Sequence, residues 1–238
     1  MLKLIKANIP NTITCLNLLA GCVAVILSFH LTETFGSLLG VELAFICIGA
    51  AAVFDFCDGL AARVLKAYSE VGKQLDSLSD LVSFGVAPAM ILFNLMSYAN
   101  GGAIASYVAL FIPIFGALRL ARFNVDDRQT TTFIGLPIPA NAIFWIGMSA
   151  WMASTASTGN YPGDTAMILL VIGMSLLMVS PLKMFSLKFK NLTLRDNFRR
   201  YVIILAAVLF VIFNGLAGLA WTILLYIILS FTLRNREG

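Results

Sequence analysis

Long apolar stretches separated by short polar connections make up most of this chain. At a rise of about 1.5 Å per residue, several stretches are long enough to cross the roughly 30 Å hydrocarbon core of a bilayer as helices. The pattern predicts eight such helices, near residues 12–32, 37–64, 73–98, 102–123, 138–156, 164–182, 199–214 and 216–233. We therefore expect an all-α integral membrane protein.

The first ten residues show a different pattern. Lys3 and Lys6 alternate with apolar residues, and the segment stops at Pro10. This pattern is more typical of a short helix lying in the membrane interface than of a cleaved signal peptide. We expect residues 1–10 to form an N-terminal interfacial helix.

The positions of Lys and Arg predict the orientation of the helices, because cytoplasmic loops near helix ends collect basic residues. With eight helices, all 16 basic residues fall on one face of the membrane. The opposite connections contain none; they lie near residues 32–36, 99–102, 154–163 and 214–215. We therefore expect a multi-pass protein of the cell membrane with both termini at the cytoplasmic face.

The last apolar run, residues 201–231, carries no charge and is long enough to be read as one helix or two. A single helix would place Arg234 on the face that has no other basic residue. A hairpin that turns at Asn214 and Gly215 keeps Arg234 at the cytoplasmic face. The charge pattern therefore predicts two helices here.

Composition agrees with a lipid environment. The chain of 238 residues is 60% hydrophobic and 12% charged, with a mean hydropathy of +0.92, well outside the range of soluble domains. Membrane topology and attraction to anionic lipid account for the net charge of +4, so no basic patch remains for nucleic acid. The four cysteines lie inside predicted helices without metal or disulfide spacing, which indicates small core residues.

Carboxylates inside membrane helices are costly, and they indicate function by default. Five lie in the interior of the predicted helices: Glu42, Asp55, Asp58, Asp76 and Asp80. Glu42 lies in the non-cytoplasmic half of the second helix and has no evident partner. The four aspartates lie at the cytoplasmic ends of the second and third helices, which only about nine residues connect. These helix ends must therefore be neighbours.

Spacing places the aspartates on facing surfaces. Asp55 and Asp58 are three residues apart, Asp76 and Asp80 are four apart, and both spacings put side chains on one helix face. Four ionised carboxylates at close range repel one another unless cations compensate them. Oxygen ligands favour Mg²⁺ or Mn²⁺ over zinc. Two ions about 4 Å apart would match the arrangement used in phosphoryl transfer.

Small and basic residues lie between the aspartates. Gly59, Ala62 and Gly72 leave room for a ligand near the backbone, although tight helix packing would also favour them. Arg63 at the helix end is suited to pair with a phosphate. Anchoring at the cytoplasmic face is the alternative explanation for Arg63.

Taken together, these positions form a known motif. The pattern Asp55-x2-Asp58-Gly59-x2-Ala62-Arg63-x8-Gly72-x3-Asp76-x3-Asp80 resembles, without departure, the signature of the CDP-alcohol phosphatidyltransferase family. The resemblance extends from Ile9 through the sixth predicted helix. Three further runs, at residues 76–88, 118–124 and 135–140, resemble the branch of the family whose acceptor alcohol is serine.

The resemblance implies a six-helix catalytic core, here residues 11–183, that works as a homodimer on CDP-diacylglycerol and releases CMP. The cytoplasmic loop and two helices of residues 184–238 would then be an addition. Transfer of the phosphatidyl group to L-serine would give phosphatidylserine. The active site would lie at the cytoplasmic face.

The resemblance also implies roles for single residues. Asp55, Asp58 and Asp76 would hold the metal ions, and Asp80 would both contact metal and accept the proton of the alcohol. Six residues would contact the nucleotide: Gly59, Ala62, Arg63, Gly72, Asn11 and Thr14.

The acceptor is less directly indicated. Arg119 and Arg122, three residues apart, are suited to hold the serine carboxylate with Asn124 nearby, but the two arginines also fit a purely topological role. Glycerol 3-phosphate or inositol phosphate would share the signature, with Lys188 or Arg195 as candidate phosphate ligands. A divalent-cation transporter is a remote alternative, because its ligands would lie near the membrane midplane rather than at one face.

Overall fold

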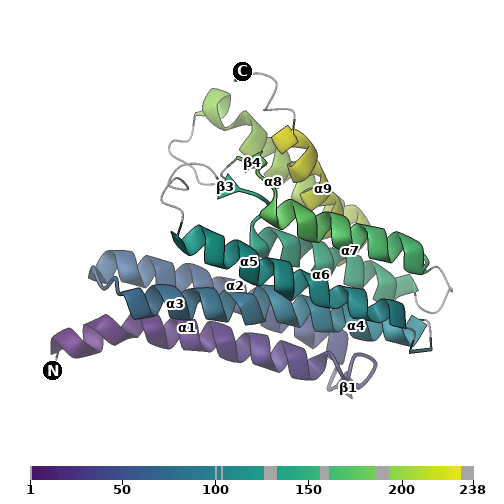
Figure 1. Ribbon diagram of the computed structural model, residues 1–238, viewed down its shortest axis with the longest axis horizontal. Helices are drawn as coiled ribbons and strands as arrows, with labels where there is room; N and C mark the ends of the chain where they lie inside the picture. Colours follow the sequence, from purple (N-terminus) through teal and green to yellow (C-terminus); the bar gives the residue numbers. More distant parts are fainter. Residues whose placement is uncertain are drawn as a thin grey trace. The chain divides into compact units, whose positions relative to one another are not determined.

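The computed structural model describes residues 2–99, 101–102, 104–125, 133–155, 161–185 and 193–231. Apart from two pairs of two-residue strands, the elements in these residues are helical (Figure 1). Within these described residues, five helical stretches are long and apolar enough to span a membrane: Asn8–Leu27, Gly40–Leu65, Glu70–Ala99, Ile104–Val125 and Asn197–Phe231. The prediction of an all-α, multi-pass membrane protein is therefore confirmed.

The chain forms two compact units, residues 1–120 and 121–238, whose boundary lies within helix α5 (Phe111–Val125). The sequence places the end of the catalytic core at residue 183 instead. Within the second unit, helix α9 (Gly218–Phe231) packs against helix α6 (Ile138–Thr155). The last helix therefore belongs to the same unit as a helix of the predicted core.

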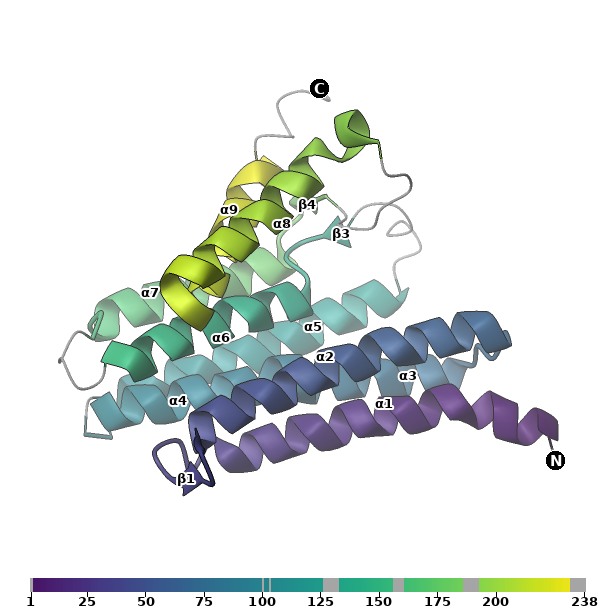
Figure 2. The ribbon, with the colours of Figure 1, turned by 180° about the vertical axis from the view of Figure 1, so that it is seen from behind.

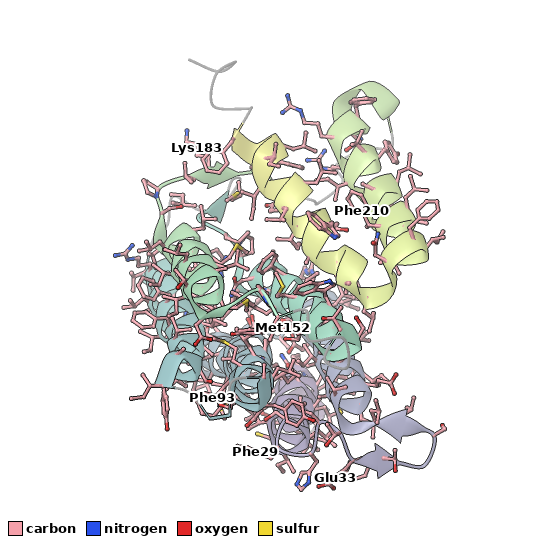
Figure 3. The ribbon with its side chains drawn as sticks, turned by 90° about the vertical axis from the view of Figure 1, so that its right-hand side faces the viewer. Phe29, Glu33, Phe93, Met152, Lys183 and Phe210 are labelled. Carbon is pink, nitrogen blue, oxygen red and sulfur yellow. The ribbon has the colours of Figure 1, made fainter. Side chains whose placement is uncertain are left out.

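The first unit consists of helices that run alongside one another (Figures 1 and 2). Its elements are α1 (Leu2–Leu27), α2 (Gly40–Leu65), α3 (Glu70–Asp80), a π-helical segment (Leu81–Val86), α4 (Ala87–Ala99) and a 3₁₀ helix (Ile104–Leu110). Helix α1 packs against α2, α3 and the π-helical segment. A hairpin of β1 (Thr34–Phe35) and β2 (Leu38–Leu39) joins α1 to α2. Phe29 and Glu33 mark this end of the unit in Figure 3.

Helix α1 differs from its prediction. It continues from Leu2 to Leu27 with Pro10 inside it, so residues 1–10 do not form a separate helix. Proline removes one backbone hydrogen bond from a helix interior. The hydroxyl of Thr12 donates to the carbonyl of Asn8 at 3.0 Å, and the hydroxyl oxygen of Thr14 lies 3.0 Å from the carbonyl oxygen of Pro10. The helix therefore passes through the proline.

The structure assigns a local role to Glu42, which has no evident partner in the sequence. Its carboxylate accepts a hydrogen bond from the backbone N–H of Leu39 at 2.8 Å, at the beginning of α2. An acidic side chain in the first turn satisfies a free N–H and opposes the positive end of the helix dipole. Glu42 therefore caps α2.

The connection between α2 and α3 is shorter than predicted. Only the four residues 66–69 separate the two helices. Lys66 adopts a left-handed conformation with φ 51°, and the N–H of Ala67 donates to the carbonyl of Ala62 at 3.0 Å. Ser69 then caps α3 by accepting from the N–H of Gly72 at 2.9 Å. This tight turn joins the two helices that carry the aspartates.

Close packing of α1 on the π-helical segment depends on Gly21. A Cβ atom at this position would lie 2.3 Å from Ser83 Oγ and 2.8 Å from Ser83 Cα. Gly21→Ala is therefore expected to destabilise the protein by about 1–3 kcal/mol through overpacking. Thermal unfolding in detergent measures the effect.

Gly49→Ala is the matched control for this prediction. Gly49 also lies inside a membrane helix, but a Cβ there would meet nothing within 4 Å. The substitution is expected to leave stability unchanged or raise it by up to about 1 kcal/mol, because alanine favours helix more than glycine. Equal effects at both positions would contradict the close contact at Gly21.

The second unit contains α6, α7 (Asp164–Val179), α8 (Leu194–Asn214), a 3₁₀ turn (Gly215–Ala217) and α9. Strands β3 (Phe133–Ile134) and β4 (Lys183–Met184) pair in antiparallel fashion. Helices α8 and α9 pack against each other after a turn at Gly215, which has φ 58°. The predicted hairpin is therefore present. Figure 3 marks Phe210, whose carbonyl oxygen would lie 2.2 Å from a Cβ at Gly218 across the turn.

Candidate active site

Three carboxylates from α2 and α3 lie close together. Asp55 on α2 and Asp76 and Asp80 on α3 each present one oxygen, and these oxygens lie within 4.8 Å of one another. In the part of the chain that the structure describes, no basic side chain pairs with them. The sequence prediction that the second and third membrane helices bring aspartates together is confirmed for these three.

The cluster is suited to a divalent metal ion. Three partly buried carboxylates repel one another in a medium of reduced dielectric unless a cation lies among them. All the donors are oxygen atoms, which Mg²⁺ and Mn²⁺ prefer. The residues present therefore fit a hard divalent cation.

Asp58 does not join this group of three. It is buried, and its Oδ2 accepts a hydrogen bond from the hydroxyl of Thr14 on α1 at 2.6 Å. Side chains three residues apart on a helix diverge by about 60° around its axis, so Asp55 and Asp58 share a face without pointing at one spot. The structure thus gathers three carboxylates and directs the fourth toward α1, whereas the sequence predicts one cluster of four.

Helix α1 also contributes a residue that the sequence reasoning missed. Asn17 is fully buried, and its Nδ2 lies 3.4 Å from Asp80 Oδ1. Asn17 is three residues after Thr14 and so shares its helix face. A polar pair at this spacing, in the otherwise apolar run of residues 13–27, is the signal that would have found it.

Two of the predicted nucleotide residues lie together at the beginning of α3. A Cβ at Gly72 would lie 2.9 Å from Asn11 Oδ1 and 2.9 Å from Ser69 Oγ. Any larger residue at position 72 would displace these side chains. Asn11 and Gly72, 61 positions apart in the sequence, are therefore neighbours in the structure.

The other predicted nucleotide residues lie at the end of α2. Arg63 is exposed, and its Nε donates to the carbonyl of Gly59 at 2.8 Å. A Cβ at Gly59 would meet only Arg63 Nη2, at 3.7 Å, so the surface there is open. Ala62, which lies between Gly59 and Arg63 in the sequence, is half-buried. This helix end presents a cation and a small-residue surface.

The predicted acceptor residues lie on α5. Arg119 is buried and belongs to the first unit. Arg122 belongs to the second, and its Nη1 donates to the carbonyl of Val179 at the end of α7, at 3.1 Å. A cation at a helix C-terminus is electrostatically favourable. Asn124 is half-buried. Of the alternative phosphate ligands, Lys188 lies outside the described residues and Arg195 lies in the first turn of α8.

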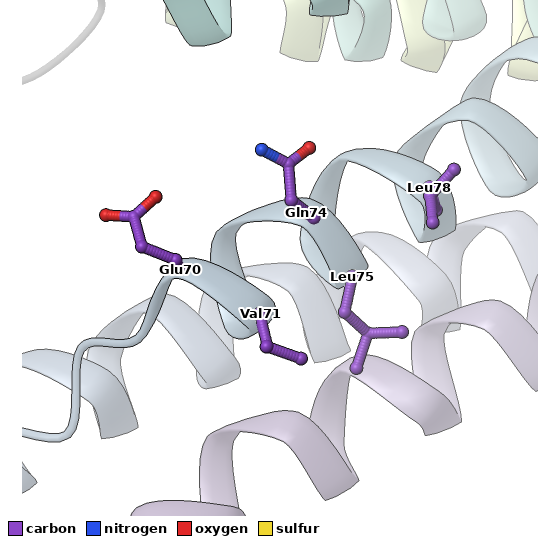
Figure 4. A pocket seen from close by; sticks show the side chains of 5 residues that line it. All are labelled: Glu70, Val71, Gln74, Leu75 and Leu78. Carbon is purple, nitrogen blue, oxygen red and sulfur yellow. The ribbon is translucent and has the colours of Figure 1, made fainter.

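An open groove of about 340 Å³ lies on another face of α3 (Figure 4). Its lining is Glu70, Val71, Gln74, Leu75 and Leu78. At about 100° per residue, these side chains lie on the opposite side of α3 from Asp76 and Asp80. The groove is therefore separate from the carboxylate cluster.

The fold and the site define a class: a multi-pass helical membrane protein whose clustered carboxylates are suited to a divalent metal ion. The family model described as CDP-alcohol phosphatidyltransferase matches residues 7–212. The chain belongs to this family. The match continues into α8, beyond residue 183, where the sequence resemblance predicted the end of the core.

The chain is also similar to curated proteins named CDP-diacylglycerol–serine O-phosphatidyltransferase. The protein of Bacillus subtilis (strain 168) is 39% identical over 132 residues, which cover 55% of this chain and 69% of the relative. That of Mycobacterium leprae is 34% identical over 184 residues, covering 74% and 57%. That of Methanocaldococcus jannaschii is 38% identical over 140 residues, covering 59% of each. The matches thus span less than two thirds of the last two relatives.

Proposed function

We propose that this protein transfers the phosphatidyl group of CDP-diacylglycerol to the hydroxyl of L-serine, giving phosphatidylserine and CMP. The clustering of Asp55 on α2 with Asp76 and Asp80 on α3 is the observation that carries the proposal. Membership of the CDP-alcohol phosphatidyltransferase family supports the reaction type. The names of the similar proteins support serine as the acceptor.

The aspartates have unequal roles in this proposal. Two divalent metal ions, Mg²⁺ or Mn²⁺, would be held by Asp55, Asp58 and Asp76. Asp80 is both a further metal ligand and the base. Bound metal would supply positive charge that stabilises the negative charge on the CMP phosphate, which develops as the bond between the bridging oxygen and the lipid-bearing phosphorus breaks. Asp80 takes the proton of the serine hydroxyl, the hydroxyl oxygen attacks the phosphorus that carries the lipid, and CMP leaves.

Binding of the nucleotide falls to the residues around the α2–α3 turn. Arg63 is suited to pair with a phosphate, since its guanidinium is exposed at the helix end. The small residues Gly59, Ala62 and Gly72, with Asn11 beside Gly72, leave the backbone accessible to a ligand. Arg119, Arg122 and Asn124 are the proposed ligands of the serine carboxylate.

The proposal also includes the arrangement in the membrane. Eight helices cross the bilayer, with α8 and α9 as separate crossings, and both termini and the aspartates lie at the cytoplasmic face. The distribution of basic residues supports this orientation. There a membrane-bound lipid nucleotide and a water-soluble amino acid can both reach the site. The active form is a homodimer, as the family resemblance implies.

One assay tests the acceptor. Purified protein is supplied with CDP-diacylglycerol and Mn²⁺ or Mg²⁺, and CMP release is measured separately with serine, glycerol 3-phosphate and inositol phosphate. We expect release with serine that exceeds release with either phosphate acceptor by at least about 100-fold, since buried polar groups left unpaired by the wrong substrate are costly. CMP release with glycerol 3-phosphate but not with serine would overturn the serine assignment.

A further inference from the structure

One face of α1 is hydrogen-bonded to α3 and to the π-helical segment that follows it, next to the aspartates. The hydroxyl of Ser79 donates to the carbonyl of Thr14 at 3.2 Å, and that of Ser83 donates to the carbonyl of Asn17 at 3.0 Å. Gly21 continues this face and allows the close approach described above. Two buried hydrogen bonds therefore set the register of Thr14 and Asn17 relative to Asp80.

Thr14 directs its hydroxyl to Asp58. The side chain is buried, with Asp58 Oδ2 at 2.6 Å and the carbonyl oxygen of Pro10 at 3.0 Å. A hydroxyl carries one proton, and hydrogen bonds to ionised acceptors are the stronger ones. The proton of Thr14 is therefore committed within the protein, which argues against the predicted contact with nucleotide phosphates.

Asn17 has the corresponding place beside Asp80. Its Nδ2 lies 3.4 Å from the Asp80 carboxylate, and its amide oxygen is buried without a hydrogen-bond partner among the described residues. A buried, unpaired amide oxygen destabilises the folded state, and leucine, of similar size, would avoid that cost. An asparagine at this position is therefore better explained by its contact with Asp80 than by packing.

From these contacts we propose that Thr14 and Asn17 are positioning residues for the metal-binding carboxylates. Thr14 fixes the rotamer of Asp58, and Asn17 fixes that of Asp80. Residues that orient carboxylate ligands raise metal affinity because the ligands need not be ordered on binding. The inference rests on the proposed function only in requiring that the aspartates bind a divalent metal.

Isosteric substitutions with matched controls test this role. Thr14→Val and Asn17→Leu remove the polar contacts at nearly constant volume. Thr12→Val is the control for Thr14, because Thr12 has the same back-bond to the helix, to the carbonyl of Asn8, but none to an aspartate. Asn94→Leu is the control for Asn17. The Asn94 amide donates hydrogen bonds to Ser28 Oγ and to the carbonyl of Met90, neither of which is an aspartate.

The readout is Mn²⁺ affinity of the purified, folded protein, measured by electron paramagnetic resonance without either substrate. We expect Thr14→Val and Asn17→Leu each to weaken Mn²⁺ binding by about 10–100-fold. Thr14→Ser, which keeps the hydroxyl, should restore binding. Both controls should bind Mn²⁺ as the unaltered protein does.

Two outcomes would overturn the proposal: unchanged Mn²⁺ affinity in Thr14→Val and Asn17→Leu, or an equal loss in the controls. A raised KM for CDP-diacylglycerol in Thr14→Val with unchanged Mn²⁺ affinity would instead return Thr14 to the nucleotide site. Because Mn²⁺ binding is measured without serine, a failure of the serine assignment would leave this result intact.

Discussion

Asp80→Asn is expected to lower kcat for phosphatidyl transfer by about 10²–10⁴-fold, the range by which a positioned general base accelerates a reaction. Asparagine has nearly the same shape as aspartate but cannot accept the proton of the serine hydroxyl. Asp55 and Asp76 remain, so CDP-diacylglycerol should still bind. Initial rates of CMP release at saturating substrates measure kcat, and binding of a labelled CDP-diacylglycerol measures affinity.

Glu33→Gln is the matched control for Asp80→Asn. It removes one negative charge from an exposed carboxylate that pairs with His30 at 2.8 Å, in the connection between α1 and α2. Its kcat should equal that of the unaltered protein. Normal turnover in Asp80→Asn would refute the assignment of Asp80 as the base.

Asp55→Asn and Asp76→Asn are each expected to reduce Mn²⁺ affinity by at least about 100-fold, the upper end of the effect of residues that merely support metal ligands. Each substitution removes one of the three carboxylates whose oxygens lie within 4.8 Å of one another. Turnover at low Mn²⁺ should fall in parallel. Titration of Mn²⁺ against CMP release and against the resonance signal of free Mn²⁺ measures both effects.

A chelator provides the complementary experiment on the unaltered protein. Removing divalent metal should abolish CMP release, and adding Mn²⁺ back should restore it. Glu33→Gln should again behave as the unaltered protein in the titration. Full turnover in Asp76→Asn at low Mn²⁺ would show that the cluster is not the metal site.

Most of the helices and the location of the site can be predicted from the sequence. Apolar stretches of 20 or so residues have few alternatives to helix in a bilayer, because lipid satisfies no backbone hydrogen bonds. The fixed spacing of Asp55, Asp58, Asp76 and Asp80, together with the short connection between their helices, is sufficient to predict that α2 and α3 bring carboxylates together. Residue spacing is therefore sufficient to predict the part of the site that lies on two helices consecutive in the sequence.

Contacts across other helices could not be predicted in the same way. The hydrogen bond from Thr14 to Asp58 joins residues 44 positions apart, and that from Asn17 to Asp80 joins residues 63 apart. These bonds depend on how α1 is rotated and placed along its axis. Gly21 and the hydrogen bonds from Ser79 and Ser83 determine that placement. No local pattern encodes that register.

The exact beginnings and ends of the helices also cannot be predicted from the sequence. Pro10 indicated a break, but the loss of one hydrogen bond did not end α1. The sequence predicts that α2 begins at residue 37, before its actual beginning at Gly40, and therefore places Glu42 inside the membrane. With α2 beginning at Gly40, Glu42 lies in the first turn and caps the helix.

Diffraction from crystals grown with Mn²⁺ and CDP-diacylglycerol, recorded at the manganese absorption edge, tests the central claim most directly. We predict anomalous peaks within coordination distance of the carboxylates of Asp55, Asp76 and Asp80, beside the diphosphate of the bound nucleotide. The same map should show Asp58, held by Thr14, as a further ligand. An active protein whose crystals show the bound nucleotide but no anomalous peak at these aspartates would contradict the account.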